Sequence, residues 1–136
     1  MLRLAARYAD IVGILPAPIK SAQDTDDPAD RTPAAFDRKV AVLREAAGDR
    51  FARLQLSSFV TMRLTDHRRD TTERLIAARG WTGTTVEAVW DMPTVLIGSA
   101  TQIRDDLDQR RERFGLSYLV AGDDDLPTLE KVIAAR

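Results

Sequence analysis

Segments with helical periodicity alternate with extended apolar runs along this chain, and that alternation predicts the type of sheet. Extended runs are predicted at residues 11–15, 54–64 and 118–122, with helices before, between and after them. Strands separated by helices pair in parallel, because the chain must cross back over the sheet before the next strand begins. The sequence therefore predicts an α/β protein with three parallel strands.

Capping residues predict where several helices begin and end. Thr32 and Pro33 predict the start of a long helix, and Gly48 predicts its end. Residues 84–87 and 99–102 match capping boxes, in which a hydroxyl and a Glu or Gln side chain satisfy backbone groups three residues apart. These two segments therefore predict two further helix starts.

Two other helices are predicted with less distinct starts. Asp66 is expected to cap a helix that runs to about Arg79 and ends at Gly80. The helix after the last strand is expected to bury Leu126, Leu129 and Ile133.

The strand at residues 54–64 alternates between two kinds of face. One face is mainly apolar and carries Leu54, Leu56, Ser58, Val60, Met62 and Leu64. The other is mixed and carries Gln55, Ser57, Phe59, Thr61 and Arg63. Such alternation places the apolar face against a core. The mixed face suits an open sheet that meets water, and it equally suits a barrel strand that lines a lumen.

The composition excludes several classes of protein. The 136 residues suffice for one domain, and a net charge of −1 gives no reason to expect nucleic acid or an anionic membrane as partner. No cysteine is present, so disulfides, thiolate metal sites and cysteine nucleophiles are excluded. Arg3 and Arg7 interrupt the first apolar stretch, which is unlike a signal peptide. A cytoplasmic location is predicted.

A polar segment separates the first strand from the long helix. Residues 16–32 are rich in aspartate and lack periodicity, so they predict a mobile acidic loop. Its carboxylates are interpreted as solvated groups rather than as metal ligands.

Four ordered segments resemble the C-terminal part of the luciferase-like monooxygenase superfamily. They are LRLAARYADIVGI (2–14), FDRKVAVLREAAGDRF (36–51), LQLSSFVTMRL (54–64) and PTVLIGSATQIRDDLDQRRERFGLSYLV (93–120). The nearest branch is that of deazaflavin (coenzyme F-420)-dependent oxidoreductases. The resemblance implies a partial (β/α)8 TIM barrel, with residues 1–136 as one incomplete domain that supplies about the last three βα units.

The resemblance also implies a chemistry. Members of the family transfer a hydride to or from coenzyme F-420, or insert oxygen with flavin mononucleotide (FMN), and act on small molecules. Their glycine-rich phosphate turn precedes the helix that here begins near Met1. The chain is therefore expected to be truncated and inactive alone. A homodimer or a separate N-terminal half is the expected partner, and the isolated half-barrel is expected to be marginally stable because its strand edges lack partners.

Two interpretations other than a truncated oxidoreductase remain. The first is a non-catalytic half-barrel remnant that acts as an interaction module. The second is a small flavodoxin-like α/β domain, for which three strands form a poor sheet.

Arg63 is the one residue predicted to bind the cofactor. It lies on the mixed face near the C-terminal end of its strand, which is the active-site end of a parallel barrel. An arginine there suits an anionic cofactor tail or a substrate phosphate. The alternative is a solvated arginine at a strand end. No catalytic residue and no metal ligand is predicted.

Other candidates have structural alternatives. His67 is compatible with a general base, although a surface histidine at a helix start is favoured. Residues 98–101 resemble a weak phosphate cradle, but a helix cap explains them. Trp81 and Trp90 suit either the cover of a pocket or core packing. Residues 123–125 are interpreted as negative charge at a helix N-terminus.

Overall fold

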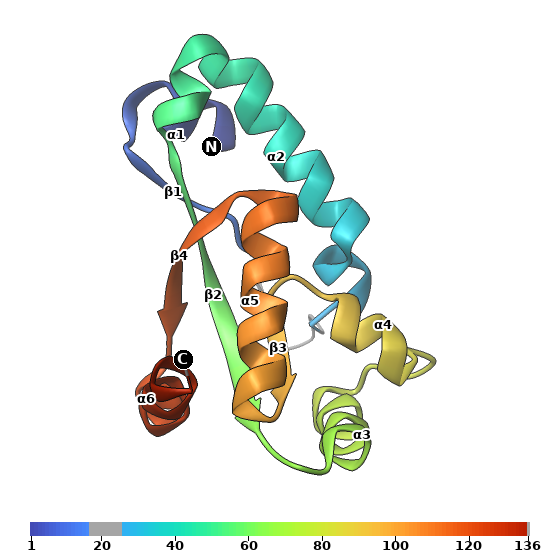
Figure 1. The fold of residues 1–136 in the computed structure, drawn as a ribbon. Helices are drawn as coiled ribbons and strands as arrows, with labels where there is room; N and C mark the ends of the chain where they lie inside the picture. Colours follow the sequence, from blue (N-terminus) through green and yellow to red (C-terminus); the bar gives the residue numbers. More distant parts are fainter. Residues whose placement is uncertain (17–25, 136) are drawn as a thin grey trace.

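The computed structural model describes residues 1–16 and 26–135, and these residues form a small parallel sheet with six α-helices (Figure 1). The strands are β1 (Ile11–Gly13), β2 (Gln55–Leu64), β3 (Val95–Gly98) and β4 (Leu116–Ala121). The helices are α1 (Leu2–Tyr8), α2 (Pro33–Ala47), α3 (Arg68–Arg79), α4 (Val86–Asp91), α5 (Ala100–Phe114) and α6 (Leu126–Ala134). Three short 3-10 helices complete the described elements: η1 (Pro28–Arg31), η2 (Gly48–Arg53) and η3 (Asp123–Asp125). The predicted α/β class with parallel strands is confirmed.

Every other strand pairs with β2. Its first residues pair with β1 on one edge, and residues 56–60 pair with β4. Its last residues, 61–64, pair with β3. Backbone N–H groups of Gln55 and Thr61 donate to Asp10 and Thr94, which precede β1 and β3. Residues of a strand that are an even number of positions apart direct their backbone groups to the same edge, and Gln55 and Thr61 are six positions apart. The strands β1 and β3 therefore pair with the same edge of β2, one after the other.

The prediction of three strands was wrong, because β3 is a fourth. All four residues of β3 are buried, so the strand shows no alternation between a polar and an apolar face. A run this short and uniformly apolar is not distinguished by periodicity from part of a helix. The additional strand covers the C-terminal half of β2, which the three-strand prediction left without a partner on that edge.

Two predicted helix starts also require correction. Thr85, not Thr84, caps α4, because its hydroxyl accepts a hydrogen bond from the Ala88 N–H at 3.1 Å. His67, not Asp66, precedes the first turn of α3, and no side chain caps that turn. At α4 two adjacent threonines are equally suited to the cap, so the sequence leaves the start open by one residue, whereas the cap position of α3 lies one residue after the Asp66 that the sequence favours.

The predicted inward face of the last helix was partly wrong. Leu126 and Ile133 are exposed by 51% and 55%, whereas Val132 is 2% exposed. Leu129 is partly buried, as predicted. The helix has nine residues and buries one narrow row against β2 and α5, so the other apolar positions remain outside.

Helices cover the apolar face of β2. Around its first half lie side chains from α1, α2 and α5, where the rings of Phe36 and Phe114 meet edge to face with centroids 5.1 Å apart. Around its second half, Val60 and Met62 pack with Ile103 of α5 and Val132 of α6. The predicted burial of this face is confirmed.

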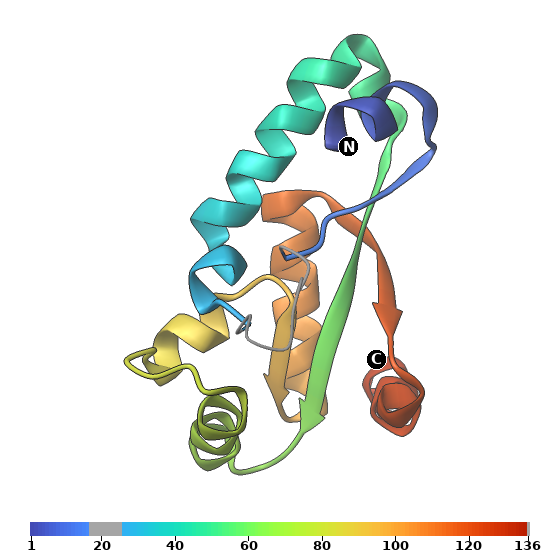
Figure 2. The same cartoon turned by 180° about the vertical axis from the view of Figure 1, so that it is seen from behind.

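The mixed face of the sheet is covered only in part. Over β3, helices α3 and α4 pack against Val95 and Ile97. Among the described residues, no helix covers the same face over β2 and β4, as Figure 2 shows from behind. We call this side of β2 and β4 the open face, and its side chains are Gln55, Ser57, Phe59, Thr61, Arg63, Tyr118 and Val120, of which Ser57 is buried.

The predicted acidic loop at residues 16–32 lies partly outside the described residues, which omit 17–25. The described residues 26–32 of this segment include the 3-10 helix η1. Asp26 accepts hydrogen bonds from Arg31 at 2.8 Å and from Arg79 at 2.9 Å, and its carbonyl accepts one from the Trp81 indole. The mobility of the segment stays a prediction. Within the described ranges, no helix has the length and apolar character needed to cross a membrane.

Gly98 provides a test of the junction between β3 and α5. Its φ is +146°, and a Cβ at this position would lie 2.5 Å from Oε1 of Gln102. We therefore expect Gly98→Ala to lower the free energy of unfolding by about 1–3 kcal/mol in urea denaturation. Gly122→Ala is the control, because Gly122 has a φ of −73° and an added Cβ would make an ordinary 3.8 Å contact with Phe59. Equal effects of the two substitutions would contradict the prediction.

Candidate functional site

Arg63 lies at the C-terminal end of β2 and is engaged by the chain itself. Its Nη1 donates to the Met62 carbonyl at 2.7 Å and to Oδ1 of Asp125 at 3.2 Å. Asp125 comes from η3, which follows β4, and its side chain is 13% exposed against 47% for Arg63. Since β2 and β4 are parallel neighbours, their carboxyl ends bring these two residues together.

The surroundings of Arg63 limit what it binds. Asp125 offsets its charge, and Asp123 and Asp124 follow β4 in the same short helix. Among the described side chains that define the open face, Arg63 is the one cation. Arg63 therefore offers an anion only the guanidinium donors that Asp125 and the Met62 carbonyl do not use.

Two exposed aromatic side chains on the open face could bind a ring system rather than an anion. Phe59 and Tyr118 are exposed by 51% and 49%, and they stand on neighbouring strands. Tyr118 is in register with Ser57, two residues before Phe59, so the two rings are diagonal neighbours. Together they offer an aromatic surface suited to a planar ring system.

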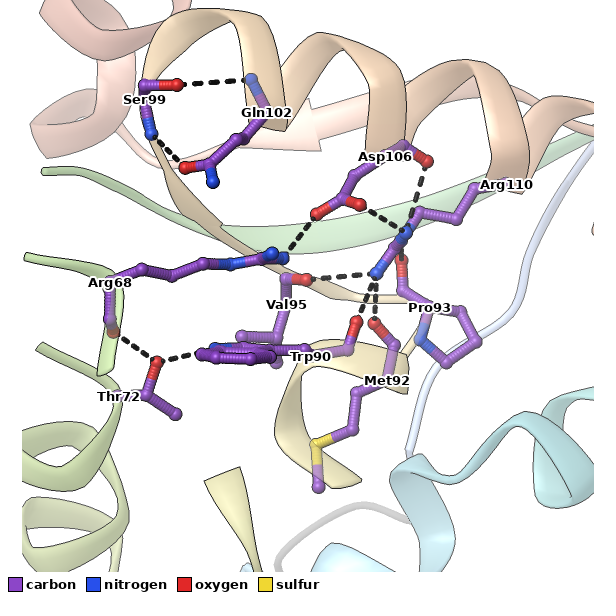
Figure 3. Close-up of polar contacts among 10 residues, drawn as sticks. All are labelled: Arg68, Thr72, Trp90, Met92, Pro93, Val95, Ser99, Gln102, Asp106 and Arg110. Carbon is purple, nitrogen blue, oxygen red and sulfur yellow. Dashed lines mark hydrogen bonds and ion pairs between the residues drawn. The ribbon is translucent and has the colours of Figure 1, made fainter. Parts of the chain in front are cut away.

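The two other sequence candidates near strand ends have structural roles. The backbone N–H of His67 donates to the Thr65 hydroxyl at 3.0 Å, and His67 is exposed just before α3. At the start of α5, Ser99 and Gln102 form the predicted capping box, which is confirmed (Figure 3). Its two hydrogen bonds, at 2.9 and 3.3 Å, use donors that a phosphate cradle would offer to a ligand.

Both tryptophans pack within the protein. Trp81 is 2% exposed and belongs to the cluster that joins α3, α4 and β3. The indole N–H of Trp90 donates to the Thr72 hydroxyl at 2.9 Å, and the Arg68 guanidinium lies 4.4 Å from the centroid of the Trp90 ring system. These contacts favour the packing interpretation.

A buried arginine that the sequence did not identify as important joins α5 to the turn before β3. Arg110 is 6% exposed, and its Nη2 donates to the carbonyls of Trp90 at 2.8 Å and Met92 at 3.1 Å. Its Nε donates to the Pro93 carbonyl at 3.3 Å (Figure 3). Asp106 lies one helical turn before Arg110, and its Oδ1 is 3.7 Å from Nη1 of Arg110. The carbonyl contacts had no sequence signal because they join residues 17–20 positions apart.

Asp106 is shared between two arginines. Arg68 of α3 donates to its Oδ2 at 2.9 Å, while Arg110 lies on its other side (Figure 3). Burial raises the pKa of the Asp106 carboxyl, and the positive charges of Arg110 and Arg68 offset that effect only in part. Burial also lowers the pKa of Arg110.

A cavity of about 230 Å³ opens beside this network, lined among others by Arg68, Trp90 and Arg110. Arg110 already donates to five backbone carbonyls, and the carboxylate of Asp106 is paired on both oxygens. The arrangement therefore acts as an internal clamp between α3, α4 and α5. In residues 1–16 and 26–135, no group of three potential metal ligands comes together.

No protein-family model matches this chain, and no curated protein sequence matches it significantly.

Arg110→Met tests the clamp. The substitution removes the donors that satisfy the carbonyls of the α4–β3 turn, and it leaves Asp106 with one cationic partner. We expect a loss of about 3 kcal/mol in the free energy of unfolding, because breaking a buried ion pair strands the remaining polar groups. Arg74→Met is the control, since Arg74 is 75% exposed in a surface pair with Asp70. A loss no larger than that of the control would contradict the clamp.

Asp106→Asn tests the electrostatics of the same network. Because the folded-state pKa of Asp106 is raised above 3.8, the folded protein holds this proton more tightly than the unfolded chain. Its contribution to stability therefore decreases as pH rises from about 3.8 through the raised folded-state pKa. We expect the stability of the wild type relative to Asp106→Asn to fall across that window in urea denaturation. If the stability of the wild type relative to Asp106→Asn instead rose with pH, the raised pKa of Asp106 would be contradicted.

Proposed function

We propose that this chain is part of a luciferase-like oxidoreductase and that its open face contributes to the cofactor pocket. One observation carries the proposal: helices cover the apolar face of β2, while no helix of the described residues covers its mixed face over β2 and β4. The wall of a barrel has helices outside and strand side chains directed inward, and β2 and β4 have this arrangement, whereas α3 and α4 cover the mixed face over β3. The resemblance of four ordered segments to that family supports the same interpretation. The partial (β/α)8 barrel is part of this proposal.

The open face suits the ring of the cofactor better than its anionic end. Phe59 and Tyr118 offer an aromatic surface on which a tricyclic ring would lie. Arg63 is the residue we propose for contact with an anionic group of cofactor or substrate, through the donors that Asp125 does not use. Coenzyme F-420 is the cofactor we favour, with FMN as the alternative. The cofactor, when bound, supplies the redox chemistry, and the protein positions it beside a small-molecule substrate.

A non-catalytic half-barrel or interaction module is the second candidate. A specific observation favours it: β4 pairs directly with β2. In a barrel, consecutive strands are neighbours, and β3 would stand between β2 and β4. This strand order, together with the exposed aromatic residues of the open face, also suits a surface that binds another protein.

Titration with coenzyme F-420 and, separately, with FMN tests the proposal, with binding followed by cofactor fluorescence. We expect coenzyme F-420 to bind with a micromolar Kd. Arg63→Gln is expected to weaken binding about tenfold, which corresponds to one charge-assisted hydrogen bond. Phe59→Ser is expected to weaken it by a similar factor, because the ring loses its aromatic support.

Arg74→Gln is the matched control, because Arg74 lies exposed on α3 and pairs with Asp70. Its Kd should equal that of the wild type. Binding of neither cofactor would remove the open face as a cofactor site and favour the interaction module. Equal effects of Arg63→Gln and Arg74→Gln would remove Arg63 from the proposed site.

A further inference from the structure

The free edge of β1 carries hydrogen-bonding groups that no described strand uses. On its inner edge, the Ile14 N–H donates to the Ser57 carbonyl at 2.7 Å, and Asp10 accepts from Gln55 at 2.9 Å. Because backbone groups alternate between the two edges, Ile11 and Gly13 direct theirs outward. The next outward carbonyl, that of Leu15, accepts from Lys39 Nζ at 2.8 Å. Within residues 1–16 and 26–135, the edge of β1 is thus closed at Leu15, and no strand pairs with the outward backbone groups of Ile11 and Gly13.

An apolar groove runs beside this edge. Its volume is about 600 Å³, and α1 and β1 line it with side chains that include Met1, Leu2, Ile11 and Leu15. Lys39 of α2 and Asp30 of η1 are the charged residues that line it. Backbone donors and acceptors within an apolar groove require a partner that offers both hydrogen bonds and apolar side chains. An extended strand meets that requirement, whereas a helix has no free backbone groups along its side.

The strand β4, on the opposite edge of the sheet, is less suited to this kind of pairing. The register of β4 with β2 shifts between Leu56 and Ser57, so β4 contains an irregularity of the bulge type. Bulges disrupt regular pairing and turn a strand away from further partners. In β1, the register from Ile11 to Gly13 is regular, and its outward residues carry no charge.

We propose that β1 pairs antiparallel with β1 of a second copy of this chain, about a two-fold axis at Val12. The axis places Ile11 of each copy opposite Gly13 of the other. Each such pair exchanges two N–H···O bonds, so two pairs use all the outward groups of both residues. Gly13 leaves room for the opposite isoleucine, since a Cβ built on it meets nothing within 4 Å. A net charge of −1 per chain produces little repulsion between copies.

The mass of the chain in solution tests this pairing. Light scattering after size exclusion, over loading concentrations from about 1 to 100 µM, should show the monomer mass doubling as concentration rises. Ile11→Lys places a charge on the edge and should give a folded monomer throughout this range. Ile133→Lys is the matched control, because Ile133 has similar exposure, 55% against 46%, and lies on α6 away from β1. This variant should dimerise like the wild type.

Amide hydrogen exchange of the wild-type chain provides a readout that needs no variant. The amides of Ile11 and Gly13 should become at least tenfold more protected as the dimer forms, while those of β4 stay unchanged. A monomer at every concentration, or a dimer without added protection at these two amides, would overturn the proposal. A dimer that survives in folded Ile11→Lys would also overturn it. The proposal is independent of cofactor binding, so failure of either test leaves the other standing.

Discussion

The dependence of the whole sheet on β2 is the constraint from which the rest of the structure follows. This ten-residue strand provides one edge to β1 and β3 in succession and the other edge to β4. The helices follow the same division. Side chains of α1 and α2 pack around its first half, and α6 packs near its second half, with α5 reaching both. A break in the alternation of β2 would therefore disturb two core clusters at once.

The internal clamp at Arg110 decides how much of the mixed face is covered. Arg110 binds the carbonyls of the turn between α4 and β3 and so stabilises the turn that leads into β3. Side chains of α3 and α4 pack against Val95 and Ile97 of β3. Those two helices cover the sheet over β3 and stop there. The open face over β2 and β4 is what remains, with Phe59 and Tyr118 in the middle part of the strands and Arg63 at the carboxyl end of β2. The clamp thus bounds the proposed site without belonging to it.

The sequence predicted features that depend on neighbours along the chain. The alternation in residues 54–64 predicted both faces of β2, and the Ser99–Gln102 box predicted the start of α5. Features that depend on distant residues were missed or misplaced. The strand β3 was missed because four buried residues carry no periodicity, and the carbonyl contacts of Arg110 were invisible because no pattern marks a carbonyl acceptor. Arg63 was placed at the correct strand end, but its partner Asp125 lies 62 residues away.

The pairing of β2 with β4 has a consequence for how the chain folds. The bond between Arg63 and Asp125 spans 62 residues, and the strands it joins are separated by two helices, by β3 and by α5. A contact between residues this far apart in sequence requires a large loop to close, and the entropy lost in closing it precedes the stabilisation that the contact provides. Such contacts therefore slow folding. During synthesis, β2 leaves the ribosome before β3 and β4, so the edge that pairs with β4, the part of the other edge that pairs with β3, and the side chain of Phe59 are then without their partners. Only α1 and α2 are available at that stage to pack against the apolar face of β2.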